Sequence, residues 1–221
     1  MIKLKLMGGL GNQIFQFAFG KYLSLETGAD LNLDISELSS QSTPRVYELD
    51  IFNINTGDPN FNTDIIINEP HFNFSKNTVE HAINSLKTGK SVTLSGYWQS
   101  PKYFDSLKKE VLSFLNLSLI NSNSNDCSLH IRRGDYVTLQ HFHPLLEISY
   151  YKKAIDIINP TGQIYVFSDD LNWCKENLNF REFTFIEGKS NHEDFKLMSA
   201  CSNNIIANSS FSWWAAYLNK N

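Results

Sequence analysis

Residues 129–137, Leu-His-Ile-Arg-Arg-Gly-Asp-Tyr-Val, join an apolar segment to a densely charged one. The pattern predicts a short buried strand that ends in a charged loop. Side chains at the C-terminal end of a strand face the crevice in which open α/β sheets bind ligands. Arg132 and Arg133 are always charged, and a planar guanidinium matches the paired oxygens of a phosphate. The stretch therefore predicts a site for a phosphorylated ligand, with a nucleotide as the first candidate.

Two simpler interpretations compete with this one. An Arg pair is often only a solvated surface feature, and Arg133-Gly134-Asp135 matches an adhesion tripeptide. Nothing in the chain indicates secretion, which argues against adhesion. The segments on either side of the stretch decide between a surface feature and a site.

Strands and helices are expected to alternate regularly around this stretch. Such alternation, with helices of about ten residues, is typical of a parallel, doubly wound sheet. The expected strands are residues 128–131, 163–167, 183–186 and 204–207, and the expected helices are residues 150–158, 172–178, 194–201 and 211–218. The second half of the chain is therefore expected to form one α/β unit.

The first half of the chain begins in the same way and then becomes irregular. Gly28 is expected to cap a first helix of helically spaced apolar residues. The polar run 116–126 is the best candidate linker, which divides the chain into α/β units of residues 1–122 and 123–221. In the first unit, strands are expected at residues 2–6, 29–33 and 92–95, helices over about 14–25 and 103–115, and an irregular segment at 36–76.

The composition restricts the function classes. The 221 residues suffice for one large domain or two small ones, and 13% aromatic residues indicate a packed globular chain. A formal charge of −4 without a basic stripe argues against nucleic acid as the main partner. Three widely spaced cysteines without a C-x-x-C pair favour buried reduced thiols. Without a secretory leader or an apolar run near the roughly 20 residues that span a bilayer, a cytoplasmic protein with no integral membrane segment is expected.

A glycine-rich turn at residues 8–12, Gly-Gly-Leu-Gly-Asn, follows the first expected strand. Backbone N–H groups and the helix dipole favour an anion at such a turn, and Asn12 adds a side-chain amide. A dinucleotide-binding fold with Asp34 on the ribose is an alternative, but Ile14 stands where the third glycine of G-x-G-x-x-G is needed. A purely structural turn also remains open.

Ser168, Asp169 and Asp170 end another expected strand and should face the same crevice as the Arg pair. Adjacent carboxylates suggest recognition of a metal or of hydroxyl groups. No two Asp residues of the chain are separated by a single residue, so the D-x-D arrangement of metal-dependent sugar transferases is absent. One carboxylate is expected to cap the next helix and the other to bind ribose or sugar hydroxyls. His141 and His143 are expected in a loop, and no metal is assigned to them.

Residues 208–214, Asn-Ser-Ser-Phe-Ser-Trp-Trp, place hydroxyl groups at an expected helix N-terminus, where an anion is favoured. A capped helix with a buried Trp pair is the structural alternative, although a single hydroxyl suffices for a cap. Asp194 begins the preceding expected helix and could reach the same crevice.

With these segments in view, the chain resembles the bacterial α-1,2-fucosyltransferases of glycosyltransferase family 11, which use GDP-fucose. The matching segments occur in the family's order and extend over nearly the whole chain. They are residues 8–16, 96–104, 130–136, 167–170 and 194–214. The resembling enzymes continue for some tens of residues beyond the last segment, so the second unit is expected to be incomplete at its C-terminus.

The resemblance implies a GT-B-like fold, in which two Rossmann-like α/β units with mainly parallel sheets face a crevice. It implies inverting transfer of L-fucose from GDP-β-L-fucose to O2 of a terminal galactose, without an obligatory metal or other cofactor. The first unit would serve the acceptor and the second GDP-fucose. The acceptor would be a galactose-terminated oligosaccharide or lipid-linked glycan of O-antigen or capsule type, reached at the inner membrane face.

The resemblance also assigns roles to residues. Arg132 would hold the β-phosphate, on which negative charge builds as GDP leaves, and His130 and Asp194 would contact guanine. The expected catalytic residues are Arg132, Asn12 and Asp135, and the expected donor-binding residues are His130, Arg133, Ser168, Asp169, Asp194, Asn208, Ser209, Ser210, Phe211, Gly9 and Gly11. The base that deprotonates the acceptor stays open among Glu48, Asp50, His71 and Asp135.

Two other function classes remain as alternatives. An NAD-dependent oxidoreductase would bind a dinucleotide and ignore GDP. A non-catalytic carbohydrate-binding module would use Tyr97, Trp98 and the pair Trp213–Trp214 as stacking platforms. That module leaves the charged residues 132–135 unexplained.

Overall fold

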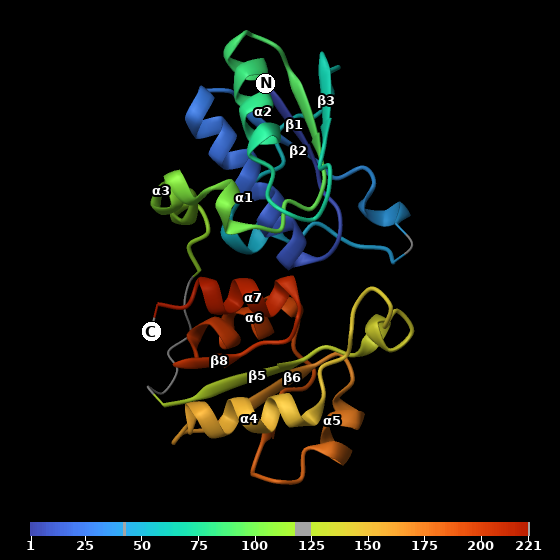
Figure 1. The fold of residues 1–221 in the computed structure, drawn as a ribbon, viewed down its shortest axis with the longest axis vertical. Coiled ribbons are helices and arrows are strands. Elements are labelled where there is room, and N and C mark those ends of the chain that lie inside the picture. Colours follow the sequence, from blue (N-terminus) through green and yellow to red (C-terminus); the bar gives the residue numbers. More distant parts are fainter. Residues whose placement is uncertain (42, 118–124, 221) are drawn as a thin grey trace. The chain divides into compact units, whose positions relative to one another are not determined.

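The computed structural model describes residues 1–41, 43–117 and 125–220, which form two compact units, Met1–Asn116 and Leu117–Asn221 (Figure 1). Each unit contains one four-stranded sheet, and every strand pair in both sheets is parallel. Most of the expected linker, and the expected boundary after residue 122, lie outside the described residues.

The sheet of the first unit has the strand order β2-β1-β4-β3. The central strand β1 (Ile2–Lys5) pairs with β2 (Leu31–Asp34) and with β4 (Val92–Ser95). The edge strand β3 (Ile65–Asn68) pairs with β4. Because the four strands are parallel, the segments that follow them leave the sheet at one edge.

The main helix of this unit is α1 (Leu10–Thr27), which packs against β1, β2 and α2 (Lys76–Lys87). It ends as expected at Gly28, whose φ of 73° is left-handed and whose N–H donates to the carbonyl of Ser24. With 18 residues, α1 is the longest helix described. Neither it nor any other helix among the described residues is long and apolar enough to cross a bilayer.

Two expectations for the first unit are wrong. The segment 36–76 is not irregular throughout, because the isoleucines 65–67 form strand β3 among polar neighbours. The expected helix 103–115 is broken, because Phe104 has a φ of −137° and leaves only the short helix α3 (Lys108–Ser113). Short 3-10 turns account for Leu38–Ser40, Leu49–Phe52, Pro101–Tyr103 and Asp105–Leu107.

Helix α2 has no counterpart among the expected elements. Its sequence nevertheless carries the pattern of an amphipathic helix, with Val79, Ala82, Ile83 and Leu86 at helical spacing. The hydroxyl of Ser75 caps it by accepting the N–H of Thr78.

The sheet of the second unit has the strand order β7-β6-β5-β8. Its two central strands are β5 (Cys127–Ile131) and β6 (Ile164–Ser168). The outer strands are the short β7 (Thr184–Phe185), beside β6, and β8 (Asn203–Ile205), beside β5. All four expected strands of this half are present, with ends that differ by two residues or fewer.

Helices cover both faces of this sheet. Figure 1 shows α4 (Ile148–Ile158) and α5 (Leu171–Asn177) on one face and α6 (Asn191–Ala200) and α7 (Ser210–Tyr217) on the other. Each corresponds to an expected helix, with ends that differ by three residues or fewer. The expectation of a doubly wound α/β unit is confirmed for the second half of the chain.

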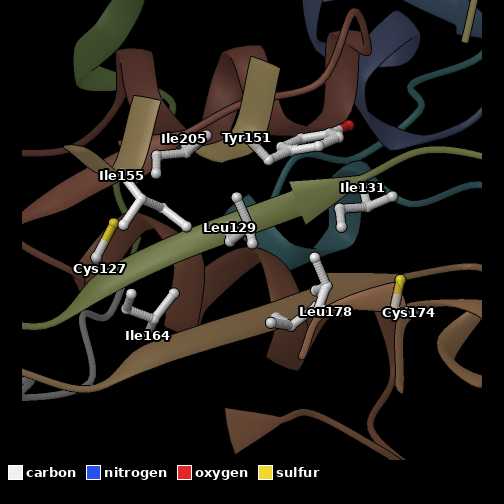
Figure 2. Close-up of a cluster of buried hydrophobic side chains, with 10 residues drawn as sticks. Cys127, Leu129, Ile131, Tyr151, Ile155, Ile164, Cys174, Leu178 and Ile205 are labelled. Atoms are coloured by element: carbon white, nitrogen blue, oxygen red, sulfur yellow. The ribbon is translucent and has the colours of Figure 1, made fainter. Parts of the chain in front are cut away.

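Buried apolar side chains fill the space around β5 and β6. Leu129 and Ile131 alternate along β5 and meet Tyr151 and Ile155 of α4 (Figure 2). His130 points to the opposite face of the strand and is also buried. A strand buried on both faces is typical of a parallel sheet covered by helices. The cluster comprises Cys127, Leu129, Ile131, Tyr151, Ile155, Ile164, Val166, Cys174, Leu178 and Ile205.

All three cysteines of the chain lie in the second unit. Cys127, Cys174 and Cys201 are free and buried, which confirms the expectation of reduced internal thiols. Burial raises the pKa of Cys127 to about 11 and that of Cys201 to about 12, and it also raises the pKa of Cys174. The thiols are therefore protonated at physiological pH.

Candidate active site

Charged and polar segments follow three neighbouring strands of the second unit. Arg132 and Arg133 follow β5, Asp169 and Asp170 follow β6, and residues 206–209 follow β8. Because β5 pairs in parallel with both β6 and β8, these segments leave the sheet at the same edge. The expectation that the Arg pair and the Asp pair meet there is confirmed by their ion pairs.

The guanidinium of Arg132 lies between two carboxylates. Nη1 is 2.9 Å from Oδ2 of Asp169, and Nη2 is 2.5 Å from Oδ1 of Asp135. The group also lies over the ring of Tyr136, 5.3 Å from the ring centroid. A quarter of the Arg132 side chain (25%) is exposed. The guanidinium is thus oriented from two sides and still accessible.

The side chain of Arg133 turns to α5 instead. Its Nε is 3.0 Å from Oδ2 of Asp170, and its guanidinium lies 3.8 Å from the ring centroid of Trp173. The hydrogen bond from Arg133 lowers the pKa of the Asp170 carboxyl. The other oxygen of Asp170 accepts the N–H of Trp173 and caps α5, which confirms the expected cap. Arg133, only 17% exposed, therefore ties the loop to α5.

Asp169 joins the loop after β5 to the end of β6. Besides the ion pair with Arg132, its Oδ1 accepts the backbone N–H of Arg133 at 2.8 Å. A Cβ on Gly134 would overlap Oδ2 of Asp169 and lie 3.0 Å from its Cγ. Glycine at position 134 therefore permits the carboxylate to approach the backbone. The neighbouring Ser168 accepts the backbone N–H of Asp170 at 3.0 Å and so shapes the same turn.

His130 lies on the face of β5 that α6 and α7 cover, and its ring is 5.8 Å from that of Phe211. Burial and, to a smaller extent, the charge of Arg132 lower its pKa to about 3, so the imidazole is neutral at physiological pH. Its Nδ1 is buried and has no hydrogen-bond partner among the described residues. Buried polar atoms are nearly always paired, so this nitrogen is a candidate ligand contact.

Asp194 in α6 presents a second unpaired atom. Its Oδ1 is buried and has no hydrogen-bond partner in the described part of the chain. Burial raises the pKa of this carboxyl to about 6, against the opposing charge of Lys189. The ring of the adjacent Phe195 lies 5.4 Å from that of Phe211, which also contacts His130. Phe211 thus connects the surroundings of the two unpaired groups.

The N-terminus of α7 completes this edge of the sheet. Ser209 is the N-cap residue, but its side chain makes no capping hydrogen bond. The preceding Asn208 makes two hydrogen bonds. Its side-chain amide donates to the carbonyl of Pro144 at 2.9 Å, and its backbone carbonyl accepts the hydroxyl of Tyr136 at 3.1 Å. Tyr136 therefore links the Arg132 loop to the turn that contains Ser209, Ser210 and Phe211.

In the first unit, the glycine-rich turn connects β1 to α1 as expected. Gly8 has a left-handed φ of 76°, Gly9 is the N-cap of α1, and Gly11 is buried in its first turn. The side chain of Asn12 accepts a hydrogen bond from Nε2 of Gln99 at 2.7 Å. The turn therefore presents an amide pair at the C-terminal edge of this sheet.

Two buried glutamines that are not among the predicted site residues hold this turn in place. Gln13 donates to the carbonyls of Gly8 and Val46, and its Oε1 accepts the N–H of Glu48. Gln16 binds both backbone groups of Met7 and donates to the carbonyl of Gly96. Only their place in the apolar face of the predicted helix could have indicated that their amides must be satisfied by backbone groups.

The four candidates for the base that deprotonates the acceptor have different surroundings. Glu48 is buried, and its Oε2 would lie 3.6 Å from a Cβ on Gly9. Asp50 is exposed, and Asp135 is paired with Arg132. Nδ1 of His71 accepts the N–H of Asn73 at 3.2 Å. Because Nδ1 accepts this hydrogen bond, a proton on the His71 ring lies on Nε2, which makes that nitrogen a donor.

The sequence as a whole was compared with models of known protein families. The model of glycosyl transferase family 11 matches residues 1–221, which is the full length of the chain.

The chain belongs to glycosyl transferase family 11.

Two relatives from Escherichia coli agree with this assignment. An alpha-1,2-colitosyltransferase is 33% identical over 99% of this chain and 87% of its own length. The O-antigen biosynthesis glycosyltransferase WbnK is 34% identical over 97% of this chain and 89% of its own length. The alignment with the first relative spans 254 residues. Since this exceeds the 221 residues of this family 11 chain, part of the difference in length lies inside the alignment.

The fold agrees with that of a solved fucosyltransferase. The NodZ fucosyltransferase from Bradyrhizobium superimposes with a TM-score of 0.51 over 98% of this chain and 91% of its own, at 11% sequence identity. This likeness concerns the fold alone. The expected GT-B-like class, with two α/β units and parallel sheets, is confirmed, and so is the resemblance to family 11.

Family membership makes the chain a glycosyltransferase and argues against an NAD-dependent oxidoreductase. Two of the four aromatic residues that the carbohydrate-binding module would use for stacking are not accessible to a sugar. Trp98 and Trp214 are fully buried, and Trp213 is stacked on Tyr217 with ring centroids 4.5 Å apart. Tyr97 and Trp213 are the two residues of the four that are partly exposed.

Proposed function

We propose that this family 11 enzyme transfers L-fucose, with inversion, from GDP-β-L-fucose to O2 of a terminal galactose in a surface glycan. The observation that carries the proposal is the set of side chains at the C-terminal edge of the second sheet. There, the partly exposed guanidinium of Arg132 follows the strand that carries His130, and among the described residues Nδ1 of His130 and Oδ1 of Asp194 are buried without a hydrogen-bond partner. This set provides contacts for a guanine base and for a diphosphate in one unit.

Asp194 and His130 are suited to guanine. Guanine presents two adjacent N–H donor groups, and a carboxylate with a buried unpaired oxygen can accept them. Adenine lacks that pair of donors. The neutral ring of His130 supplies a further polar contact from β5, and Phe211 adds an aromatic ring beside it.

Arg132 and the start of α7 are suited to the diphosphate. As GDP departs, negative charge develops on the β-phosphate oxygen, and fixed donors stabilise it best because they need no reorganisation. A guanidinium has five N–H groups, so the ion pairs of Arg132 with Asp135 and Asp169 leave donors for a phosphate. The N–H groups and hydroxyls of Ser209 and Ser210 at the N-terminus of α7 provide further donors.

The proposal needs no metal ion. Among the residues that the structure describes, no group of three or more His, Cys, Asp or Glu side chains could hold one. The carboxylates of Asp135 and Asp169 are instead engaged by Arg132. Asp135 acts here by positioning Arg132. The roles of Asn12, Gly9 and Gly11 at the donor remain predictions, as does the assignment of the first unit to the acceptor.

The name of the relative WbnK supports O-antigen as the glycan context. We propose a galactose-terminated, lipid-linked acceptor, which a cytoplasmic enzyme would meet at the inner membrane face. The name of the other Escherichia coli relative points to a second donor, because colitose is fucose without its 3-hydroxyl group. GDP-colitose is therefore the alternative sugar nucleotide to be tested.

Calorimetric titration of the purified chain tests the donor site. GDP is expected to bind with micromolar affinity, with the same affinity in EDTA, while NAD does not bind. Loss of GDP binding in EDTA would refute the metal-free site, and preference for NAD would refute the nucleotide assignment. Transfer is then measured with GDP-fucose and GDP-colitose on methyl β-galactoside. Product from GDP-colitose alone would replace fucose by colitose in the proposal.

A further inference from the structure

Two aromatic side chains stand together at the C-terminal edge of the first sheet. Phe72 follows β3, is 75% exposed, and stacks on Tyr97, which follows β4, with ring centroids 6.4 Å apart and planes 30° apart. A single exposed phenylalanine is common on protein surfaces. This one lies in a loop that is hydrogen-bonded at both ends to other segments of the first unit.

The loop that carries Phe72 is anchored at both ends. At its start, the backbone N–H of Glu69 donates to the carbonyl of Ser95 at 2.8 Å and extends the pairing of β3 with β4. At its end, the hydroxyl of Tyr103 accepts the N–H of Ser75 at 3.2 Å. The ring of Phe74 packs against Tyr103 as well. Phe72 thus lies in a short loop whose two ends are hydrogen-bonded.

The Tyr97 segment is fixed in an unusual backbone conformation. Trp98 has a left-handed φ of 55°, which is costly for a bulky residue. The carboxylate of Glu69 holds this conformation, since its Oε2 accepts the N–H groups of Tyr97 and Trp98 at 2.7 and 3.1 Å. The indole of Trp98 is fully buried against Phe19 and Tyr103. Strain of this kind is concentrated at functional sites.

Polar groups lie close to Tyr97 along the chain. The amide of Gln99, two residues after Tyr97, is exposed and donates to Oδ1 of Asn12 in the glycine-rich turn. Gln16 connects the same turn to the carbonyl of Gly96. A partly exposed aromatic pair with an exposed amide two residues after Tyr97 has the composition of a site for a sugar ring, which has apolar C–H faces and hydroxyl groups at its rim.

We propose that Phe72 and Tyr97 form the surface on which the terminal galactose of the acceptor stacks. This inference rests on the proposed function. In galactose the axial O4 leaves the C–H groups of C3, C4 and C5 free on the opposite face. Stacking of that face on Phe72 leaves O2 at the rim of the sugar, where it can react. Glu69 and Trp98 act as positioning residues, because they hold the backbone of Tyr97.

Steady-state kinetics with methyl β-galactoside and saturating GDP-fucose test the inference. Phe72→Ala is expected to raise the acceptor KM about tenfold, the effect of losing one aromatic contact, and to leave the GDP dissociation constant unchanged. Phe72→Trp, which keeps a ring, should remain within about threefold of wild type. Ile157→Ala removes a similarly exposed apolar side chain in α4, 74% exposed in the native chain, and should change neither constant.

The outcomes separate this inference from the proposed function. If wild type transfers fucose and Phe72→Ala has the wild-type acceptor KM, the stacking surface is refuted and the donor site stands. If wild type transfers neither fucose nor colitose, the proposed function fails. Saturation-transfer NMR with methyl β-galactoside then decides the inference alone. Signals at H3, H4 and H5 that disappear in Phe72→Ala support it, whereas equal signals in both proteins, or none in wild type, refute it.

Discussion

Oδ2 of Asp169 lies 2.9 Å from Nη1 of Arg132, and this ion pair joins the end of β6 to the loop after β5. Two strands of one sheet thereby fix the orientation of one guanidinium. Asp135 binds the other terminal nitrogen, Nη2, and a quarter (25%) of the Arg132 side chain stays exposed. The geometry leads to separate expectations for the guanidinium, for the glycine beside it and for the buried carboxylate of α6.

Arg132→Ala is expected to lower kcat for fucose transfer by roughly 10²–10³, the usual cost of removing one fixed donor to a developing oxyanion. Arg132→Lys should also be impaired, because an ammonium cannot reproduce the planar fork. The measurement is kcat together with the GDP dissociation constant. Arg181→Ala removes the same charge from an exposed arginine of this unit that binds the carbonyl of Pro160, and it should behave as wild type. A fully active Arg132→Lys enzyme would contradict the role of the fork.

Gly134→Ala should impair activity through Asp169. The added methyl group would displace the carboxylate, which is held by Arg132 and by the N–H of Arg133. We expect kcat to fall at least tenfold, consistent with a donor displaced by a fraction of an ångström. A double-mutant cycle with Asp169→Ala is the control. If the two losses simply add, the glycine acts independently of Asp169, since residues that share one contact are non-additive.

Ionisation of Asp194 should lower the free energy of unfolding of the second unit, so this carboxyl is expected to destabilise the unit at pH 8 and not at pH 4. Its pKa of about 6 in the folded protein exceeds the ordinary 3.8, so the folded state binds the proton more tightly. The ionised carboxylate therefore destabilises the fold above pH 6, and the penalty disappears as the pH falls towards 4. Asp194→Asn is expected to raise the free energy of unfolding at pH 8 by roughly 1–2 kcal/mol, a value reduced for partial solvation.

Chemical denaturation at pH 8 and pH 4 checks this expectation. Glu176→Gln makes the same charge change at an exposed position in α5 and should have little effect at either pH. GDP titrations supply an independent readout. Because a guanine contact requires the ionised carboxylate, the affinity of wild type should fall as the pH drops below about 6, by up to about tenfold per pH unit. A flat affinity profile between pH 5 and pH 8 would exclude Asp194 as that contact.

Gln16→Leu should destabilise the first unit. Because glutamine and leucine have similar side-chain volumes, the loss would be due to the missing hydrogen bonds and not to a cavity. The substitution leaves the N–H of Met7 and the carbonyls of Met7 and Gly96 without their buried partner. The expected loss is roughly 2–4 kcal/mol in the free energy of unfolding, from several unpaired buried groups. Gln140→Leu, at an exposed position, should stay within about 0.5 kcal/mol of wild type. Equal effects of the two substitutions would show that the amide network is dispensable.

The elements of the second unit were predictable because each short apolar run is separated from the next by an amphipathic helix. β5 and α4 are placed within two residues of their expected ends. β3 was missed because its four residues lie at a sheet edge among polar neighbours. Its three consecutive isoleucines form a run that is too short to be recognised and that shows no alternation of apolar and polar residues.

The charged residues of the candidate site were predictable as a group, but their partners were not. The sequence places Arg132, Arg133, Asp169 and Asp170 after neighbouring strands. Only the geometry shows that one arginine binds Asp169 while the other stacks on Trp173. Side-chain direction beyond a strand end depends on the loop backbone, which residue periodicity does not determine.

Because all three thiols lie in the second unit, their rate of alkylation measures how often that unit opens. An alkylating reagent attacks the thiolate, and these sulfur atoms are both sheltered and protonated. The cysteines therefore react only when Leu117–Asn221 opens. Opening of Met1–Asn116 is not detected by this reaction, because that unit contains no cysteine. The rate of mass increase under native conditions thus measures the opening of Leu117–Asn221 separately from that of Met1–Asn116. A ligand that slows this labelling must bind and stabilise Leu117–Asn221.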